Sequence, residues 1–131
     1  MKRLRILNVA ASLRSWGGVE KHICDIAPAL ASRGHDVIIA CPPRSEIERR
    51  ALETQVPVVH LTLDSPLDWK KLPGFARAMA GRYDVVHTHH PGDYLIPAVA
   101  ARIARVPLVV QSMHVPPHMP SAWSRLAHRA L

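Results

Sequence analysis

Apolar and polar residues alternate along the chain in a way that predicts strands and helices in strict succession. Five short apolar runs, bounded by polar, Gly or Pro residues, are typical of buried strands: residues 6–10, 35–41, 56–61, 84–88 and 107–111. Apolar residues recurring every three or four positions predict helices between and after them: residues 18–33, 46–53, 68–80, 93–105 and 121–131. This alternation with short connections predicts an α/β fold, a doubly wound, mostly parallel sheet flanked by helices.

The first strand–loop–helix unit, residues 5–33, is the one around which the predicted fold is organised. Its helix follows the pair Gly17–Gly18 and ends before Gly34, a residue type favoured just after a helix. Pro28 lies inside the helix and predicts a bend near residues 24–28, because proline removes a backbone hydrogen bond. In open α/β sheets the loop after the first strand faces the ligand crevice, and a helix N-terminus attracts anions. We therefore expect a phosphate or diphosphate at Gly17–Gly18.

Length and the last helix bear on the domain organisation. The 131 residues suffice for one domain and are too few for two ordinary ones. The apolar stripe of residues 121–131 is still running where the sequence stops, with no cap or closing turn. We expect residues 1–131 to be a single domain, either a truncated product or one domain of a longer enzyme.

Charge narrows the choice of partners. The net charge is +7 with a pI near 10.3, which favours anionic partners, but the basic residues are scattered and aromatic residues make up only 5%. So few aromatic side chains argue against a nucleic-acid partner and leave phosphates or an anionic membrane surface. No run approaches the roughly 18 apolar residues that a membrane-spanning helix needs. We expect a soluble cytoplasmic protein, with peripheral contact at the inner face of the plasma membrane as one option.

The densest polar cluster follows the fourth predicted strand. His87, His89, His90 and Asp93 lie in the segment HTHHPGD, and His114 follows the fifth strand at the same edge of the sheet. Three hypotheses remain open at this point. His87 is a core histidine and the rest is loop; or His89, His90, Asp93 and His114 bind a metal, although no complete ligand spacing is present; or these groups donate hydrogen bonds to hydroxyls and phosphate.

Four segments together resemble one family, the amino-terminal domain of family 4 glycosyltransferases, which are retaining enzymes of the GT-B fold. They are GGVE at 17–20, LASRGHDV at 30–37, DVVHTH at 84–89 and PLVVQSMH at 107–114. In that family two Rossmann-like domains face each other across a cleft. The amino-terminal domain mainly binds the acceptor, and the carboxyl-terminal domain binds the nucleotide-sugar donor.

The resemblance implies roles for individual residues. Gly17 and Gly18 would lie near the donor diphosphate, His114 would be the catalytic histidine facing the transferred sugar, and His89 would lie on the acceptor side. Their position at the same sheet edge, not the resemblance, adds His90 and Asp93 to the expected acceptor side of the cleft. Trp16, beside the glycine pair, is expected there too if it packs over the ligand and not under the loop. The resemblance implies no metal and no cofactor beyond the nucleotide-sugar donor substrate. Pro28 departs from the family pattern, and the donor-binding domain is missing, so it implies half of an active site.

The leading hypothesis is therefore the acceptor-side half of a retaining glycosyltransferase. It would transfer a sugar from a nucleotide-sugar to a lipid-linked, polysaccharide or other cell-envelope acceptor, and would be inactive without its donor domain. Helix dipoles and fixed hydrogen-bond donors would stabilise the diphosphate leaving group without a metal. Two alternatives stay open: a non-catalytic binding domain that docks a partner chain or an anionic membrane, and a zinc-dependent hydrolase built on the histidines.

Overall fold

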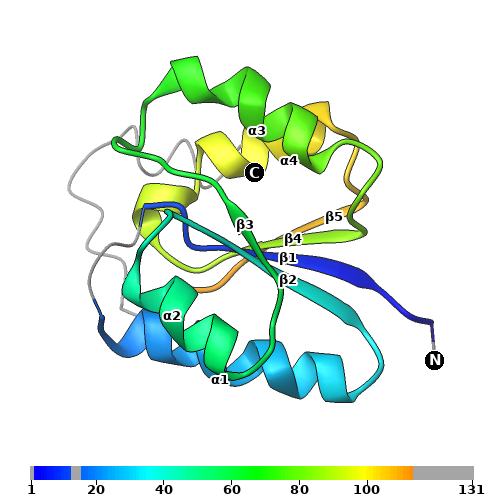
Figure 1. Ribbon diagram of the computed structural model, residues 1–131. Coiled ribbons are helices and arrows are strands. Elements are labelled where there is room, and N and C mark those ends of the chain that lie inside the picture. Colours follow the sequence, from blue (N-terminus) through cyan, green and yellow to red (C-terminus); the bar gives the residue numbers. More distant parts are fainter. Residues whose placement is uncertain (1, 13–15, 114–131) are drawn as a thin grey trace.

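The computed structural model describes residues 2–12 and 16–113 of the chain. Their strands form one 5-stranded parallel sheet in the order β3-β2-β1-β4-β5 (Figure 1). The strands are β1 (Arg5–Val9), β2 (Asp36–Cys41), β3 (Val58–His60), β4 (Val85–Thr88) and β5 (Leu108–Gln111). This arrangement confirms the predicted doubly wound α/β fold.

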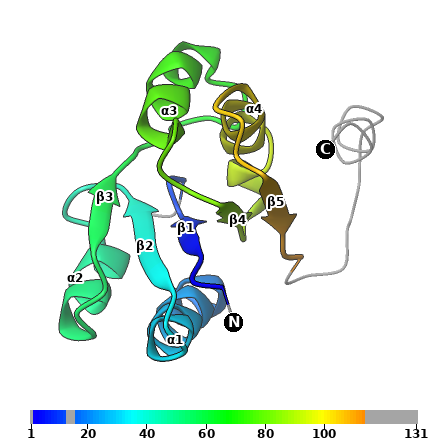
Figure 2. The ribbon, with the colours of Figure 1, turned by 90° about the vertical axis from the view of Figure 1, so that its right-hand side faces the viewer.

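Helices cover both faces of the sheet (Figure 2). One face carries α1 (Gly18–Ser32) and α2 (Glu46–Glu53), and the other carries α3 (Leu72–Met79) and α4 (Ile96–Ile103). Two short 3-10 helices, η1 (Trp69–Lys71) and η2 (Pro91–Asp93), precede α3 and α4. None of the helices in the described ranges has the length and apolar character needed to cross a lipid bilayer. The fifth predicted helix, residues 121–131, lies outside the described residues.

Two hydrophobic clusters, one on each face, bury the sheet. Leu7 and Val9 of β1 pack with Phe75, Met79 and Ile96 from the α3–α4 side. The second cluster fills the space under α1 and α2 and includes Ile23, Ala27, Ile39, Ile47 and Ala51. Since side chains alternate along a strand, Asn8 of β1 points away from Leu7 and Val9, toward the face that carries α1.

Local chemistry explains where the helices begin and end. Ser45 caps α2, its Oγ accepting a hydrogen bond from the amide of Glu48 at 3.3 Å. Gly34 follows α1 with a φ of +95°, a conformation that favours glycine. The helix α1 runs through Pro28 as one element.

Two helix boundaries differ from prediction, and proline is the reason for both. The predicted helix 68–80 is divided into η1 and α3, and Pro73 lies in the first turn of α3. The predicted helix 93–105 begins at Ile96 and ends at Ile103, with Pro97 in its first turn. Proline has no N–H to donate and fits best in a first helical turn, so each proline sets the start of its helix.

Candidate functional site

The carboxyl ends of β1 and β4 lie next to each other in the middle of the sheet. The register pairs Val9 of β1 with Thr88 of β4. The sheet runs from β1 to β2 and β3 in one direction and to β4 and β5 in the other, so this is the point where the strand order reverses. Ligands in open α/β sheets bind at such a point, outside the carboxyl ends of the strands. The loops after β1 and β4 therefore form the candidate site.

Asp93 joins these two loops. Its side chain is fully buried, and its two carboxylate oxygens accept hydrogen bonds from the amide and from the hydroxyl of Ser12, each at 2.9 Å. Burial raises the pKa of Asp93 to about 7, although the hydrogen bonds from Ser12 and from the amide of Ala11 act in the opposite direction. Asp93 therefore anchors the start of the β1–α1 loop and loses its proton close to neutral pH.

His90 lies beside this anchor. Its Nδ1 accepts a hydrogen bond from the amide of Gly92 at 3.1 Å and is 3.3 Å from the hydroxyl of Ser12. Because Nδ1 is an acceptor, a neutral His90 carries its proton on Nε2. Burial lowers the pKa of His90, and the charge of Glu20 partly opposes that shift. His90 is therefore held as a neutral ring whose Nε2–H can donate a hydrogen bond.

Gly92 allows the two loops to come this close. A Cβ at position 92 would lie 2.7 Å from the Oγ of Ser12 and 3.2 Å from the Nδ1 of His90. A Cβ does not tolerate contacts under 3.0 Å, so any larger residue must displace Ser12. The glycine is required by the close approach of the loops.

A histidine cluster, formed by His22, His87 and His89, lies on the α1 side of the sheet. The rings of His87 and His89 are 3.9 Å apart, and the ring of His22 meets that of His89 edge-on at 5.9 Å. His89 is 1% exposed, and its Nε2 lies 2.9 Å from the Oδ1 of Asn8. The Nε2 of His87 lies 2.7 Å from the Oγ of Ser112. The cluster thus joins α1 to β4, and its hydrogen-bond partners lie on β1 and just after β5.

The glycine pair opens the first turn of α1. Gly17 is the N-cap residue, and a Cβ at Gly18 would meet nothing within 4 Å. Glu20 in the same turn is buried, and its Oε2 lies 3.1 Å from where a Cβ of Gly17 would be. Both glycines are exposed, so the backbone of this turn is accessible to solvent next to a buried carboxylate.

Trp16 contacts α2. Its side chain is 36% exposed, and the guanidinium carbon of Arg50 lies 4.6 Å from the centre of its ring, a cation–π contact. Its predicted place in the cleft remains a prediction.

The end of β5 is fixed by hydrogen bonds to the residues around it. The hydroxyl of Tyr94 donates to the carbonyl of Ser112 at 2.6 Å, and the side-chain amide of Gln111 donates to the carbonyl of Tyr94 at 2.9 Å. The amide of Ser112 donates to the carbonyl of Thr88 at 2.9 Å. This segment leads to His114, the predicted catalytic residue, which lies outside the described residues.

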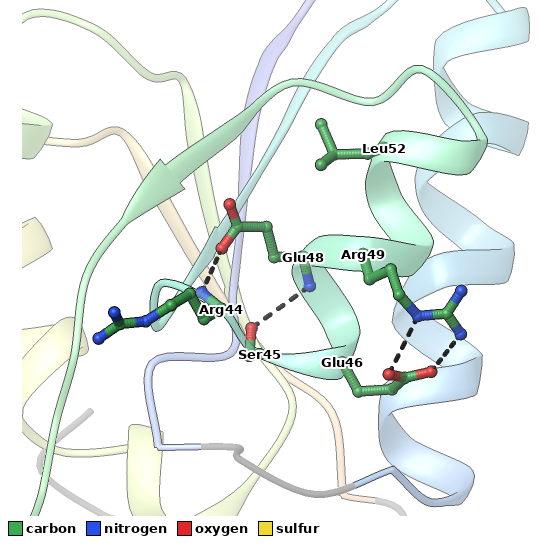
Figure 3. A pocket seen from close by; sticks show the side chains of 6 residues that line it. All are labelled: Arg44, Ser45, Glu46, Glu48, Arg49 and Leu52. Carbon is green, nitrogen blue, oxygen red and sulfur yellow. Dashed lines mark hydrogen bonds and ion pairs between the residues drawn. The ribbon is translucent and has the colours of Figure 1, made fainter.

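Other features of the described residues bear on the alternatives. Within residues 2–12 and 16–113 there is no group of three or more His, Cys, Asp or Glu side chains that could hold a metal ion. A groove of about 320 Å³ at the start of α2, here called the α2 groove, is lined by Ser45, Glu46, Glu48, Arg49 and neighbouring side chains (Figure 3). Arg49 pairs with Glu46, and Glu48 accepts from the amide of Arg44, so its charges are largely matched.

The structure brings together Asp93, His90 and the start of the β1–α1 loop, and the contact it shows for Trp16 is with Arg50 of α2. It also adds residues that no motif indicated: Ser12, Asn8 and His22. Asn8 had one signal, because it is a polar residue inside an apolar strand run. Ser12 and His22 had none, because their contacts depend on the relative positions of strands and helices.

Comparisons with known proteins identify the family and agree with the fold. The profile of the glycosyl transferase 4-like domain family matches residues 17–131. The crystal structure of Anabaena HepE in complex with UDP-glucose has a TM-score of 0.69 and 22% identity, over 98% of this chain and 34% of that chain. The HepE complex with UDP has a TM-score of 0.66 and 23% identity, over 96% of this chain and 33% of that one. The chain thus spans about a third of HepE, and no curated protein matches it. At these identities HepE shows the fold alone.

Proposed function

Because this chain belongs to the glycosyl transferase 4-like domain family, we propose that it is the acceptor-side half of a retaining glycosyltransferase. In this proposal the enzyme transfers a sugar, of the hexose type, from a nucleotide-sugar to a lipid-linked, polysaccharide or other cell-envelope acceptor. HepE, which shares the fold, is known in complex with UDP-glucose, and this supports a nucleotide-sugar as the donor. No other cofactor takes part.

The observation that carries the proposal is the exposed start of α1 at the reversal point of the strand order. Gly17 and Gly18 are exposed at the first turn of α1, where backbone amides have no partner within the helix, and the neighbouring Glu20 is buried. Backbone amides and the positive end of a helix dipole stabilise negative charge that develops on a leaving group. The glycine pair therefore binds the donor diphosphate when the cleft closes.

The remaining residues of the site hold or contact the acceptor. Asp93 is a positioning residue, because its fully buried carboxylate holds Ser12 at the start of the β1–α1 loop, which leads to the glycine pair. His90 donates its Nε2–H to an acceptor hydroxyl. His89 forms the wall behind it, and Trp16 lies at the outer margin of the loop. His114 faces the transferred sugar and acts in catalysis.

A second domain, which binds the nucleotide, completes the site in this proposal. The chain spans about a third of HepE, and this supports a half-site whose activity depends on a partner domain. We place the enzyme in the cytoplasm, at the inner face of the plasma membrane, where the net charge of +7 favours contact with anionic lipids.

A transfer assay with isotope-labelled nucleotide-sugars tests the proposal. We expect transfer by the chain joined to its donor domain and none by the 131-residue chain alone. In the joined form, His114→Ala should lower kcat by about 100-fold or more and change the KM for the donor by less than about threefold, as expected for a group that acts in the chemical step.

His118→Ala is the matched control, since it removes a histidine four positions further along and should leave kcat near that of the wild type. An unchanged kcat in His114→Ala would remove His114 from the mechanism. No transfer by either form would favour the non-catalytic binding domain instead.

A further inference from the structure

A second groove, of about 550 Å³, opens beside the carboxyl end of β3, and we call it the β3 groove. Pro43 reaches it from the end of β2, and His60 and Thr62 from the end of β3. The other side is lined by η1 and α3, with Lys70, Lys71, Pro73, Gly74, Phe75 and Arg77. The groove therefore lies on the same edge of the sheet as the candidate site. Its volume is within the range of small-ligand pockets.

The lining of the β3 groove is positively charged. Lys70, Lys71 and Arg77 line it, and no Asp or Glu does. None of these three cations forms an ion pair with a carboxylate in the described ranges of the chain. Glu48 is nearby, 3.0 Å from the Nε2 of His60, but it lines the α2 groove.

The contrast with the α2 groove (Figure 3) shows why this charge indicates a ligand. In the α2 groove the guanidinium of Arg49 is matched by Glu46. In the β3 groove three cations surround one concavity without a carboxylate among the lining side chains. A cleft lined by one sign of charge concentrates its field and attracts ions of opposite charge.

A backbone hydrogen bond connects the β3 groove to the candidate site. The amide of Leu63 donates to the carbonyl of Ala11 at 2.9 Å, so the segment that leaves the groove at Thr62 touches the start of the β1–α1 loop. The ends of β3 and β1 are two strand spacings, about 10 Å, apart. That distance is comparable to the length of a sugar phosphate.

We propose that the β3 groove binds a phosphate ester of the acceptor. Lys70, Lys71 and Arg77 neutralise the phosphate, and the hydroxyl of Thr62 donates a hydrogen bond to it. When the phosphate is bound there, the rest of the acceptor extends along the sheet edge toward His90 and the β1–α1 loop. Only the identification of the ligand as the acceptor rests on the proposed function; the binding of the phosphate does not.

The phosphate could come from a soluble sugar phosphate or from a lipid headgroup. Trp69, which directly precedes the two lysines, is 49% exposed, and Leu67, two positions before Trp69, is 63% exposed. Exposed apolar side chains next to lysines are typical of contacts with the membrane interface. The two sources share the same chemistry, and the experiment separates them.

The first experiment is an NMR titration of the 131-residue chain with glucose 6-phosphate, using glucose as the uncharged reference. We expect saturable shifts of the amides of Thr62, Lys71 and Gly74 with glucose 6-phosphate only. The triple variant Lys70→Gln, Lys71→Gln, Arg77→Gln should bind at least about tenfold more weakly, since charge-assisted contacts to phosphate are lost.

The matched control removes three positive charges at the opposite edge of the sheet: Lys2→Gln, Arg33→Gln, Arg82→Gln. These residues are exposed, and we expect less than a twofold change in affinity. Equal losses in both triple variants would attribute binding to net charge and overturn the proposal.

The second experiment is cosedimentation with vesicles of phosphatidylglycerol and phosphatidylcholine, compared with phosphatidylcholine alone. Binding to the anionic vesicles that is lost in the groove variant and kept in the control variant supports a lipid-borne phosphate. Binding of glucose 6-phosphate alone supports a soluble acceptor. Binding of neither probe overturns the proposal. Retained phosphate binding without any sugar transfer would overturn the proposed function and leave the groove assignment standing.

Discussion

The two edges of the sheet differ in how deeply their polar side chains are buried. At the amino edge, Arg3 pairs with Asp36 and Arg5 with Asp84, and the side chains of Arg3, Asp36 and Arg5 are about half exposed or more. All the polar side chains that are buried in the described ranges lie at the carboxyl edge or in the half of the sheet next to it. They are Asn8, Glu20, Thr88, His89 and Asp93.

This difference indicates which edge is used for function. Exposed ion pairs contribute little to stability, because water already solvates both charges. Burial of a polar group costs free energy unless hydrogen bonds replace those to water, and the Nδ2 of Asn8 and the Oγ1 of Thr88 have no partner among the described residues. A fold accepts such a cost mainly at sites where it serves a function. The carboxyl edge is thus the side of the sheet where buried polar groups cost stability.

The largest expected effect is a pH dependence caused by Asp93. Its pKa is about 7 in the folded chain against about 4 when unfolded, so between these values the folded state keeps a proton that the unfolded state releases. Stability from this group is therefore complete below pH 4 and is lost as the pH rises through 7, by up to about 4 kcal/mol. Asp93→Asn should remove this loss.

Urea unfolding of both chains between pH 4 and pH 8 measures the effect. The quantity to follow is the difference between wild type and Asp93→Asn, since other groups, including His90 with its lowered pKa, titrate in both. A difference that stays constant across this range would mean that Asp93 ionises at an ordinary pKa despite its burial.

The next largest effect is expected at Gly92. In Gly92→Ala the new methyl group would lie 2.7 Å from the Oγ of Ser12, so the hydroxyl must leave its place against Asp93. We expect a loss of about 1–3 kcal/mol, as for overpacking elsewhere. Gly18→Ala is the control, because nothing lies within 4 Å of its Cβ and alanine is favoured in helices. Similar losses in both variants would argue against the close contact between the loops.

The smallest effect is expected at the amino edge. The hydrogen bond and charge of Arg3 lower the pKa of Asp36, so any stability from this pair is present above the unfolded pKa and is lost as the pH falls below it. Both side chains are exposed, and Arg3→Gln should unfold at nearly the same temperature as the wild type at high salt. A loss as large as that of Gly92→Ala would show that the amino edge is also important for stability.

Much of the fold could be predicted from local patterns. The alternation of strands and helices, the cap at Ser45 and the glycine after α1 depend on residues close together in the sequence. The errors were also local, since Pro73 and Pro97 begin helices that the apolar periodicity alone extends further toward the N-terminus. The placement of Gly17–Gly18, His89, His90 and Asp93 at one sheet edge followed from the same strand periodicity.

Tertiary structure alone decided how these residues meet. Ser12 and Asp93 are 81 positions apart, as are Asn8 and His89, and only the pairing of β1 with β4 brings them within hydrogen-bond distance. Contacts between other distant segments form the histidine cluster and place Trp16 against Arg50. They also bring the neighbouring Lys70 and Lys71 to the groove beside the end of β3. Periodicity specifies which side of a strand or helix is buried. It carries no information about which strands become neighbours, because neighbours are selected by the packing of the whole sheet.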